Sequence, residues 1–269
     1  MEIIDNKALL LKVRQPNKIT EVIPKSKSLS SNEVLVNWGL EEAQVLKNLK
    51  IKNVPSPICK NYKWGGKFKP FEHQKETSSF LTLNRRAFVF NEQGTGKTAS
   101  VIWAADYLMK LGFIKRVLVL CPLSIMQSAW GGDLFKFAIH RSVAIAHSYS
   151  REKRIEVVNS DAEFVICNYD GLQIIRDAVN NNEFDLIVVD EANAYKTVTT
   201  KRWKILNSVI KPHTWVWMLT GTPASQSPTD AYGLARIISP ANVPKYFGTF
   251  KDLVMYKVSQ FIWLPKEKA

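Results

Sequence analysis

The sequence predicts an α/β fold in which a parallel β-sheet has helices on both faces and is preceded by a small α+β module. Between residues 67 and 240, short apolar runs alternate with segments of helical periodicity, the pattern of strand–helix–strand units. The run from Leu186 to Val189 is apolar throughout, as expected of a strand covered on both faces. The expected strands are 87–90, 117–121, 143–146, 164–167, 186–190 and 215–219.

The first of these strands leads into a glycine-containing loop and then a helix. Residues 91–98 read Asn-Glu-Gln-Gly-Thr-Gly-Lys-Thr, and helical periodicity follows over 98–110. A strand, a glycine loop and a helix N-terminus direct backbone N–H groups at one point, where a di- or triphosphate can bind. The pattern predicts a P-loop that binds a di- or triphosphate, although asparagine replaces its usual first glycine. The expected nucleotide-binding residues are Gln93, Gly94, Thr95, Gly96, Lys97 and Thr98.

Two carboxylates complete the expected catalytic set. Asp190 and Glu191 follow the apolar run that ends at Val189, and open α/β sheets bind ligands at the carboxyl ends of their strands. We expect Lys97 to reach the β- and γ-phosphates, and Thr98 and Asp190 to hold Mg²⁺. Glu191 is the candidate for polarising the attacking water.

Several segments resemble the ordered motifs of superfamily-two helicases. The sequence Asp-Glu-Ala-Asn at 190–193 resembles a DEAD/DEAH-type box, and the lysine-bearing segment 194–201 is similar to the tail of that box in Swi/Snf-like DNA translocases. The resemblance extends over roughly residues 68–250, and within the family the motifs are most similar to those of helicases encoded by tailed bacteriophages. The other matching segments are 71–74 (Q motif), 117–124 (motif Ia), 166–169 (motif Ib) and 219–223 (motif III).

The resemblance implies a RecA-like ATP-binding lobe that moves on DNA. It places Gln74 on the adenine edge. Contacts to the DNA backbone alone imply duplex binding without sequence preference. The implied DNA-contacting residues are Pro122, Leu123, Ser124, Asn168 and Tyr169, and the residues implied to couple nucleotide state to the DNA grip are Asn193, Thr220, Gly221 and Thr222. The family has histidine or aspartate where this chain has Asn193, which can donate a hydrogen bond to Thr220 or a nearby group but cannot titrate.

The family hydrolyses ATP between two RecA-like lobes, and the residues after motif III contain nothing similar to motif VI. We therefore expect residues 241–269 to begin a bridge toward a second lobe that this chain lacks. Loss of an arginine finger costs roughly 10³ to 10⁵ in rate, so the isolated chain is expected to bind ATP but hydrolyse it poorly. Two alternatives stay open: the lobe of a DEAD-box-type RNA helicase, and a nucleotide-gated DNA-binding module without hydrolysis.

Composition is consistent with these expectations. The formal net charge of +13 indicates a polyanionic partner. Cys59, Cys121 and Cys167 lie far apart and form no metal-binding pattern, which favours reduced cysteines and a cytoplasmic protein, in the host cell if phage-encoded. No apolar run approaches the roughly 18–20 residues that a membrane span needs.

Residues 1–66 form the predicted leading module, for which the sequence gives no role. The run 60–69 alternates cations with aromatic residues, which is compatible with nucleic-acid binding but favours packing of the aromatic rings on the main lobe. Trp215 and Trp217, in the last expected strand, are predicted to be core residues. The module's expected elements are strands at Ala8–Val13, Ile19–Ile23 and Val34–Val36, an exposed turn at 26–32 and a helix at Leu40–Leu49.

Overall fold

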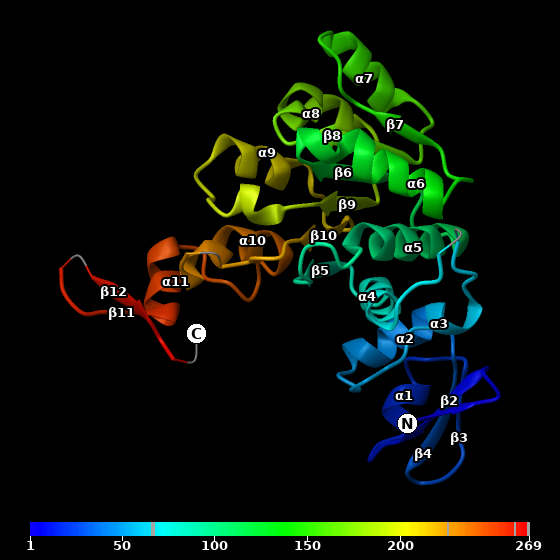
Figure 1. Cartoon of the computed structure of the whole chain (residues 1–269). Coiled ribbons are helices and arrows are strands. Elements are labelled where there is room, and N and C mark those ends of the chain that lie inside the picture. The colour runs from blue at the N-terminus through cyan, green and yellow to red at the C-terminus, as the bar shows by residue number, and fades with distance from the viewer. Residues whose placement is uncertain (66–67, 225, 261, 268–269) are drawn as a thin grey trace.

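The computed structural model describes residues 1–65, 68–224, 226–260 and 262–267. Its centre is a six-stranded sheet, in the order β5-β10-β9-β6-β8-β7, in which every neighbouring pair is parallel (Figure 1). This confirms the predicted α/β class. The strands are β5 (Arg86–Val89), β6 (Val117–Cys121), β7 (Val143–Ile145), β8 (Phe164–Asn168), β9 (Leu186–Val189) and β10 (Trp215–Leu219).

Helices cover both faces of this sheet (Figure 1). Side chains alternate along a strand, so Val119 packs with α5 on one face while its neighbours Leu118 and Leu120 pack with α8 and α9 on the other. This explains why the central strands are apolar at consecutive positions. The helices of this domain are α4 (Glu72–Thr82), α5 (Lys97–Lys110), α6 (Gly132–Phe137), α7 (Arg151–Asn159), α8 (Gly171–Asn181), α9 (Lys201–Val209) and α10 (Ala231–Ile238).

The two tryptophans of β10 and the cysteines at two strand ends are buried in the core, as predicted. Trp215 and Trp217 are buried in β10, and the Trp217 indole donates to the carbonyl oxygen of Asn84 at 3.0 Å. Cys121 and Cys167 are buried free thiols, and burial raises the pKa of both. They are core residues, as expected of apolar strand ends.

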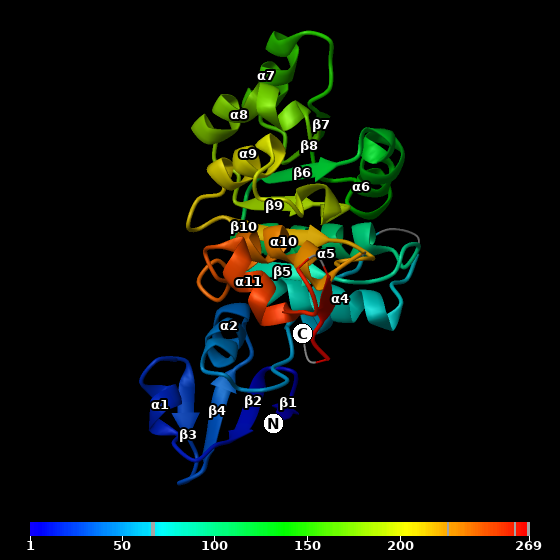
Figure 2. The same ribbon diagram turned by 90° about the vertical axis from the view of Figure 1, so that its left-hand side faces the viewer.

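The N-terminal module is a four-stranded antiparallel sheet in the order β1-β2-β4-β3 and lies beyond α4 (Figure 2). Its buried face is made by side chains such as Leu9 and Val36, which are register partners on neighbouring strands. Its elements are β1 (Glu2–Ile4), β2 (Ala8–Lys12), α1 (Asn17–Thr20), β3 (Ser26–Ser28), β4 (Glu33–Asn37), α2 (Leu40–Asn48) and α3 (Ile58–Asn61).

Two predictions for this module were wrong in part. The expected strand Ile19–Ile23 is instead the short helix α1 and the turn after it; Ile19 and Ile23, four residues apart, share one helical face and are both buried. The expected turn 26–32 is exposed, but its first half forms the edge strand β3 because it pairs with β4. A segment of five residues is too short to show whether its apolar side chains repeat with the period of a strand or with that of a helix.

Polar contacts attach the module to the main domain. Gln44 Nε2 donates to the carbonyl oxygen of Thr82 at 2.9 Å, and the hydroxyls of Ser56 and Thr82 lie 2.7 Å apart. Tyr62 packs edge-to-face on Trp64, and Trp64 packs edge-to-face on Trp103 of α5. These contacts agree with the prediction that the aromatic rings of residues 60–69 pack on the main lobe. The predicted domain boundary at residues 66 and 67 lies outside the described residues.

A buried carboxylate of α5 joins this helix to two distant segments. Asp106 is fully buried and accepts hydrogen bonds from Tyr62 Oη, Lys110 Nζ, His140 Nε2 and Arg141 Nε, at 2.7 to 2.8 Å. Burial alone would raise the pKa of Asp106, but these hydrogen bonds outweigh it and lower the pKa to about 2. The cluster fixes the helix that begins at the P-loop.

The C-terminal residues form a small arm at the side of the lobe (Figures 1 and 2). It consists of α11 (Phe247–Val254), β11 (Met255–Lys257) and β12 (Trp263–Pro265), and Phe250 of α11 packs on Tyr232 of α10. Among the described residues, no helix is long and apolar enough to cross a membrane. Exposed apolar side chains on the arm are Tyr246, Phe247, Leu253, Tyr256, Val258, Ile262 and Leu264.

Candidate active site

Apart from Gln74, which lies in α4, the predicted site residues lie at or after the carboxyl ends of strands in the parallel sheet. Because those ends share one edge, segments that are far apart in sequence meet there. The segments begin with Asn91 after β5, Pro122 after β6, Tyr169 after β8, Asp190 after β9 and Thr220 after β10.

The P-loop has the backbone shape that its glycines predict. Gly94 and Gly96 have φ values of 79° and 75°, in the left-handed region that favours glycine. Lys97 is buried at the start of α5, and its Nζ donates to the carbonyl oxygens of Asn91 and Glu92 at 2.8 and 2.9 Å. A Cβ on Gly96 would lie 2.1 Å from Nε2 of Gln74. The loop therefore closes tightly around its lysine.

Gln74 binds the P-loop from α4. Its Nε2 donates to the carbonyl oxygen of Thr95 at 3.2 Å, and its Oε1 accepts from the backbone N–H of Phe71 at 3.0 Å. Nε2 of His73 lies 3.0 Å from the same Thr95 oxygen. Both ends of the Gln74 amide thus have partners within the protein, and its role on adenine stays a prediction.

Asp190 is a buried carboxylate with two donors. Its Oδ2 accepts from Nε1 of Trp130 at 2.9 Å and its Oδ1 accepts from the backbone N–H of Glu191 at 3.0 Å. Burial raises the pKa of Asp190, and the charge of Glu191 raises it further, while the hydrogen bond from Trp130 and the charge of Lys97 lower the pKa. The P-loop lysine is thus close enough to this carboxylate for its charge to lower the carboxylate's pKa.

Glu191 has an unusual backbone conformation, with φ 47° and ψ 55°. A non-glycine residue in this region stores of order 1 kcal/mol or more of strain and is over-represented at functional sites. The Tyr169 hydroxyl donates to the carbonyl oxygens of Asp190 and Glu191 at 2.6 and 3.3 Å. The surrounding structure therefore fixes the turn that presents the predicted water-activating side chain.

The Asp-Glu box also connects to motif III. Asn193 Nδ2 donates to Oγ1 of Thr222 at 2.9 Å, and Oγ1 of Thr220 accepts from the backbone N–H of Thr222 at 3.2 Å. Sequence reasoning expected Asn193 to bond with Thr220 or a nearby group, and the observed partner is the nearby Thr222. Gly221 lies against the P-loop, since a Cβ there would be 3.7 Å from the backbone N of Gln93.

The residues implied to contact DNA differ in accessibility. Leu123 and Ser124 are exposed on the short helical turn after β6, and Pro122 is half-buried. Asn168 is half-buried, and its Oδ1 has no hydrogen-bond partner among the described residues. The Tyr169 hydroxyl already bonds to the box, so this side chain has its polar atom turned toward Asp190 rather than outward.

The donor set fits Mg²⁺ that arrives with nucleotide phosphates. Within the described part of the chain, no three His, Cys, Asp or Glu side chains form a metal cluster. Mg²⁺ in phosphate-transfer sites needs only one or two carboxylates, because water and phosphate oxygens complete its shell. Thr98 and Asp190 provide one hydroxyl and one carboxylate at the same edge of the sheet.

Sequence reasoning missed the contact of Trp130 with Asp190. The two residues are 60 positions apart. The only signal in the sequence is the general rule that a buried indole N–H and a buried carboxylate each need a partner. The sequence also offers no signal for His140, which is one of the partners of Asp106.

Known proteins resemble this chain over the same region. The chain is 25% identical over 180 residues to the ATP-dependent helicase YqhH of Bacillus subtilis, covering 65% of this chain and 30% of that protein. It is 29% identical over 180 residues to protein p41 of Acyrthosiphon pisum secondary endosymbiont phage 1, covering 62% of this chain and 38% of that protein. The chain thus spans about a third of the length of these relatives.

A solved structure and a family model agree with these similarities. The SWI2/SNF2 ATPase core of Sulfolobus solfataricus in complex with dsDNA superimposes with a TM-score of 0.62 at 25% identity, covering 70% of this chain and 39% of that one. This match confirms the RecA-like architecture of the main domain. A model of the SNF2-related domain matches residues 22–260, most of the chain. The protein whose strands, P-loop and Asp-Glu box are described above therefore belongs to the SNF2-related family.

Proposed function

We propose that this chain is the ATP-binding first lobe of a DNA-dependent ATPase that couples hydrolysis to movement on duplex DNA. The observation that carries the proposal is the convergence of the P-loop, the Asp-Glu box and motif III at one edge of the sheet. Lys97 interacts electrostatically with Asp190, Asn193 bonds to Thr222, and Gly221 lies beside Gln93. This arrangement suits positioning and charge stabilisation, which dominate catalysis of phosphoryl transfer.

Each residue has a role in this proposal. The backbone N–H groups of residues 93–97 and the ammonium of Lys97 bind the phosphates, for which Lys97 exchanges its present carbonyl partners. Thr98 and Asp190 hold Mg²⁺, which neutralises charge on the phosphates. Glu191 accepts the hydrogen bond of the attacking water, and Gln74 contacts the adenine edge once its bond to Thr95 is released.

Duplex DNA is the proposed polymer partner. The formal net charge of +13 favours a polyanion. The Sulfolobus relative was solved as a complex with dsDNA. We place DNA phosphates against the exposed turn at Leu123 and Ser124 and the neighbouring end of β8 at Asn168. Backbone contacts of this kind give little sequence preference and an affinity that falls steeply with salt.

A second RecA-like lobe is the other proposed partner. The aligned region covers 30% and 38% of these two relatives, so each is roughly three times as long as that region. Residues 241–269 include the arm with exposed apolar side chains, and we propose that this arm begins the bridge to that lobe. The isolated chain then binds ATP but hydrolyses it slowly, because the arginines that stabilise the transferred phosphate belong to the second lobe.

The test is ATP binding and steady-state hydrolysis by the chain, with and without duplex DNA, beside Lys97→Ala. Lys204→Ala, an exposed lysine on α9, is the matched control. We expect nucleotide binding that is lost in Lys97→Ala, kept in Lys204→Ala, and accompanied by hydrolysis near background. Strong DNA-stimulated turnover would refute the need for a second lobe, and absence of nucleotide binding in the wild type would refute the function itself.

Competition between duplex DNA and RNA addresses the alternative of an RNA helicase lobe. The chain is expected to prefer duplex DNA, and its affinity is expected to drop by orders of magnitude between about 50 and 200 mM salt. A preference for RNA, or an affinity that does not change with salt, would count against the proposal.

A further inference from the structure

Two loops at the active edge of the sheet have the same construction. The loop after β6 exposes Leu123 and Ser124 and then buries Trp130, and the segment after β8 has Asn168 at its rim and Tyr169 turned inward. In each, a position proposed to meet DNA is followed by an aromatic side chain that bonds to the Asp-Glu box. In the sheet order β9-β6-β8, the two loops follow the first and second strands on the same side of β9, where the box begins.

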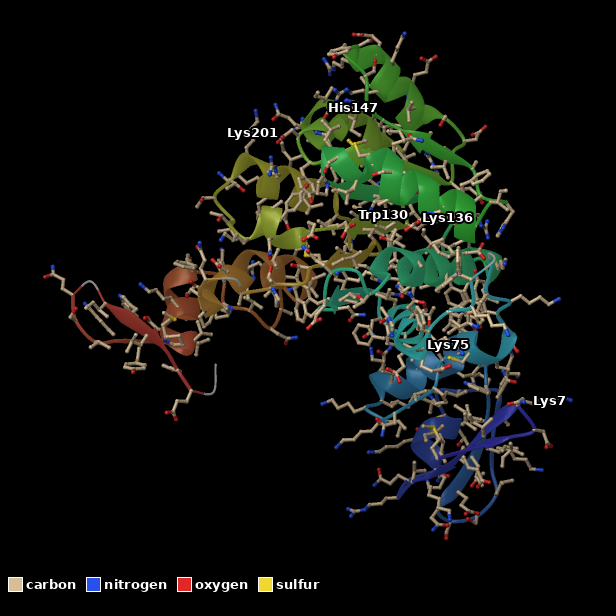
Figure 3. The ribbon with its side chains drawn as sticks, in the orientation of Figure 1. Lys7, Lys75, Trp130, Lys136, His147 and Lys201 are labelled. Carbon is tan, nitrogen blue, oxygen red and sulfur yellow. The ribbon has the colours of Figure 1, made fainter. Side chains whose placement is uncertain are left out.

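Trp130 contacts the metal-binding carboxylate directly. Its ring is fully buried in the hydrophobic cluster that includes residues of α5, and Figure 3 labels it in the interior of the lobe. Its Nε1 donates to Oδ2 of Asp190 at 2.9 Å, which leaves the carboxylate oriented by a side chain from another loop. Trp130 belongs to a π-helical turn, Met126–Gly131, a distortion that is common at functional sites.

Tyr169 contacts the backbone of both box residues. Its hydroxyl bonds to the carbonyl oxygens of Asp190 and Glu191, and its ring packs edge-to-face on the buried Tyr195 with centroids 5.5 Å apart. The guanidinium of Arg202 lies 5.3 Å from the same ring and pairs with Asp170. The ring is therefore fixed by neighbours, and its hydroxyl holds the left-handed turn at Glu191 in place.

We propose that Trp130 and Tyr169 are positioning residues that set the geometry of Asp190 and Glu191 and transmit DNA binding at their loops to the nucleotide site. This proposal rests on the function proposed above. Trp130 orients the carboxylate that holds Mg²⁺, and Tyr169 holds the peptide that presents Glu191. A duplex pressed on Leu123, Ser124 or Asn168 shifts the loops that carry these two aromatic side chains.

Trp130→Phe and Tyr169→Phe remove the hydrogen bonds while keeping a ring in each position. The measurements are the dissociation constants of a fluorescent ATP analogue with Mg²⁺ and with EDTA, each with and without duplex DNA. Loss of a partner behind a metal ligand typically weakens metal binding about 10- to 100-fold. Trp130→Phe is expected to reduce the Mg²⁺-dependent gain in nucleotide affinity by that factor and to leave the affinity in EDTA nearly unchanged.

Tyr169→Phe is expected to act on coupling. In the wild type, DNA should change the affinity for Mg²⁺–nucleotide by at least about fivefold, and nucleotide should change the affinity for DNA by the same factor. In Tyr169→Phe both factors should fall toward one, while DNA affinity without nucleotide persists. A general loss of packing would lower every affinity or the folded fraction, but it would not selectively remove the linkage between nucleotide binding and DNA binding.

Two variants control for the loss of an aromatic hydrogen bond elsewhere. Trp103→Phe removes an indole bond to the carbonyl oxygen of Gly65, and Tyr232→Phe removes hydroxyl bonds to the carbonyl oxygens of Pro244 and Lys245. Both are expected to keep the metal-dependent gain and the coupling factor of the wild type.

The outcomes separate the two proposals. A wild-type chain that binds neither nucleotide nor DNA would overturn the proposed function, and the positioning roles with it. Two other outcomes would overturn the positioning roles alone. In the first, the wild type binds both nucleotide and DNA, but neither ligand changes the affinity for the other. In the second, Trp130→Phe keeps the Mg²⁺-dependent gain in nucleotide affinity and Tyr169→Phe keeps the linkage between nucleotide and DNA binding.

Discussion

Replacing Asp106 by asparagine tests whether the buried carboxylate holds the P-loop helix in place. The substitution keeps the shape of the side chain but removes its charge and presents an NH₂ group to cationic donors. Tyr62 and Arg141, the less exposed partners, then lose a charged acceptor inside the protein. Breaking a buried ion pair from one side costs about 3–5 kcal/mol in the free energy of unfolding.

The structure places the expected cost at the lower end of that range. Lys110 and His140 are nearly half exposed, so they can turn to water, and we expect a loss of about 3 kcal/mol at pH 7. The lowering of the Asp106 pKa from 3.8 to about 2 accounts for about 2 kcal/mol of this, at about 1.36 kcal/mol per pKa unit. At roughly 2–4 °C per kcal/mol, the melting temperature should fall by about 6–12 °C.

The loss should depend on pH in a defined direction. Because folding lowers this pKa, the carboxylate stabilises the protein fully above the unfolded pKa near 4, and its contribution is lost as the pH falls through about 2. About half of the pH-dependent part should be gone by pH 3, so the difference between wild type and Asp106→Asn should shrink by about 1 kcal/mol.

Thermal unfolding followed by near-ultraviolet circular dichroism at pH 7 and pH 3 measures both effects. Asp133→Asn, which removes an exposed pair with Lys136, is the control and should cost less than about 1 kcal/mol. A melting temperature of Asp106→Asn equal to that of the control, or a difference that does not shrink at pH 3, would refute the reasoning.

Further predictions concern the nucleotide site. Gly96→Ala should destabilise the chain and weaken nucleotide binding more than tenfold, because the new Cβ meets Gln74 and the backbone is strained. Gly112→Ala is the control, since Gly112 has a similar φ but open space around it. This variant should cost only the backbone strain of about 1–2 kcal/mol and leave nucleotide binding intact. Equal binding in both variants, measured by titration, would contradict the packing of Gln74 on the loop. Asn193→Ala should keep nucleotide affinity within a few-fold but reduce its linkage to DNA, because the bond to Thr222 is lost; unchanged linkage would show that this bond does not couple the motifs.

Much of the fold could be predicted from local sequence. The strands before the P-loop and the Asp-Glu box are short apolar runs that end in motif residues, and their positions in the structure match to within one or two residues. The helix after Gly96 begins at Lys97, as the loop requires. These features depend on neighbours a few positions apart, so periodicity and spacing suffice to predict them.

Short apolar segments and long-range partners could not be predicted in the same way. Ile19 and Ile23 fit a strand or a helical turn equally well, and only packing against the four-stranded sheet selected the helix. The partner of Asn193 was expected to be Thr220 or a nearby group, and only the folded arrangement of the two motifs shows that it is Thr222.

By itself, the sequence predicted the kind of chemistry, because phosphate binding and metal binding require particular residues at fixed short spacings. The tertiary structure decided which distant side chains support that chemistry. The strand order β9-β6-β8 brings Trp130 and Tyr169 to Asp190, and packing around α5 gives Asp106 its four partners. Such contacts form only when the whole sheet is assembled, because buried polar groups must find partners among whatever chain segments the packing places beside them.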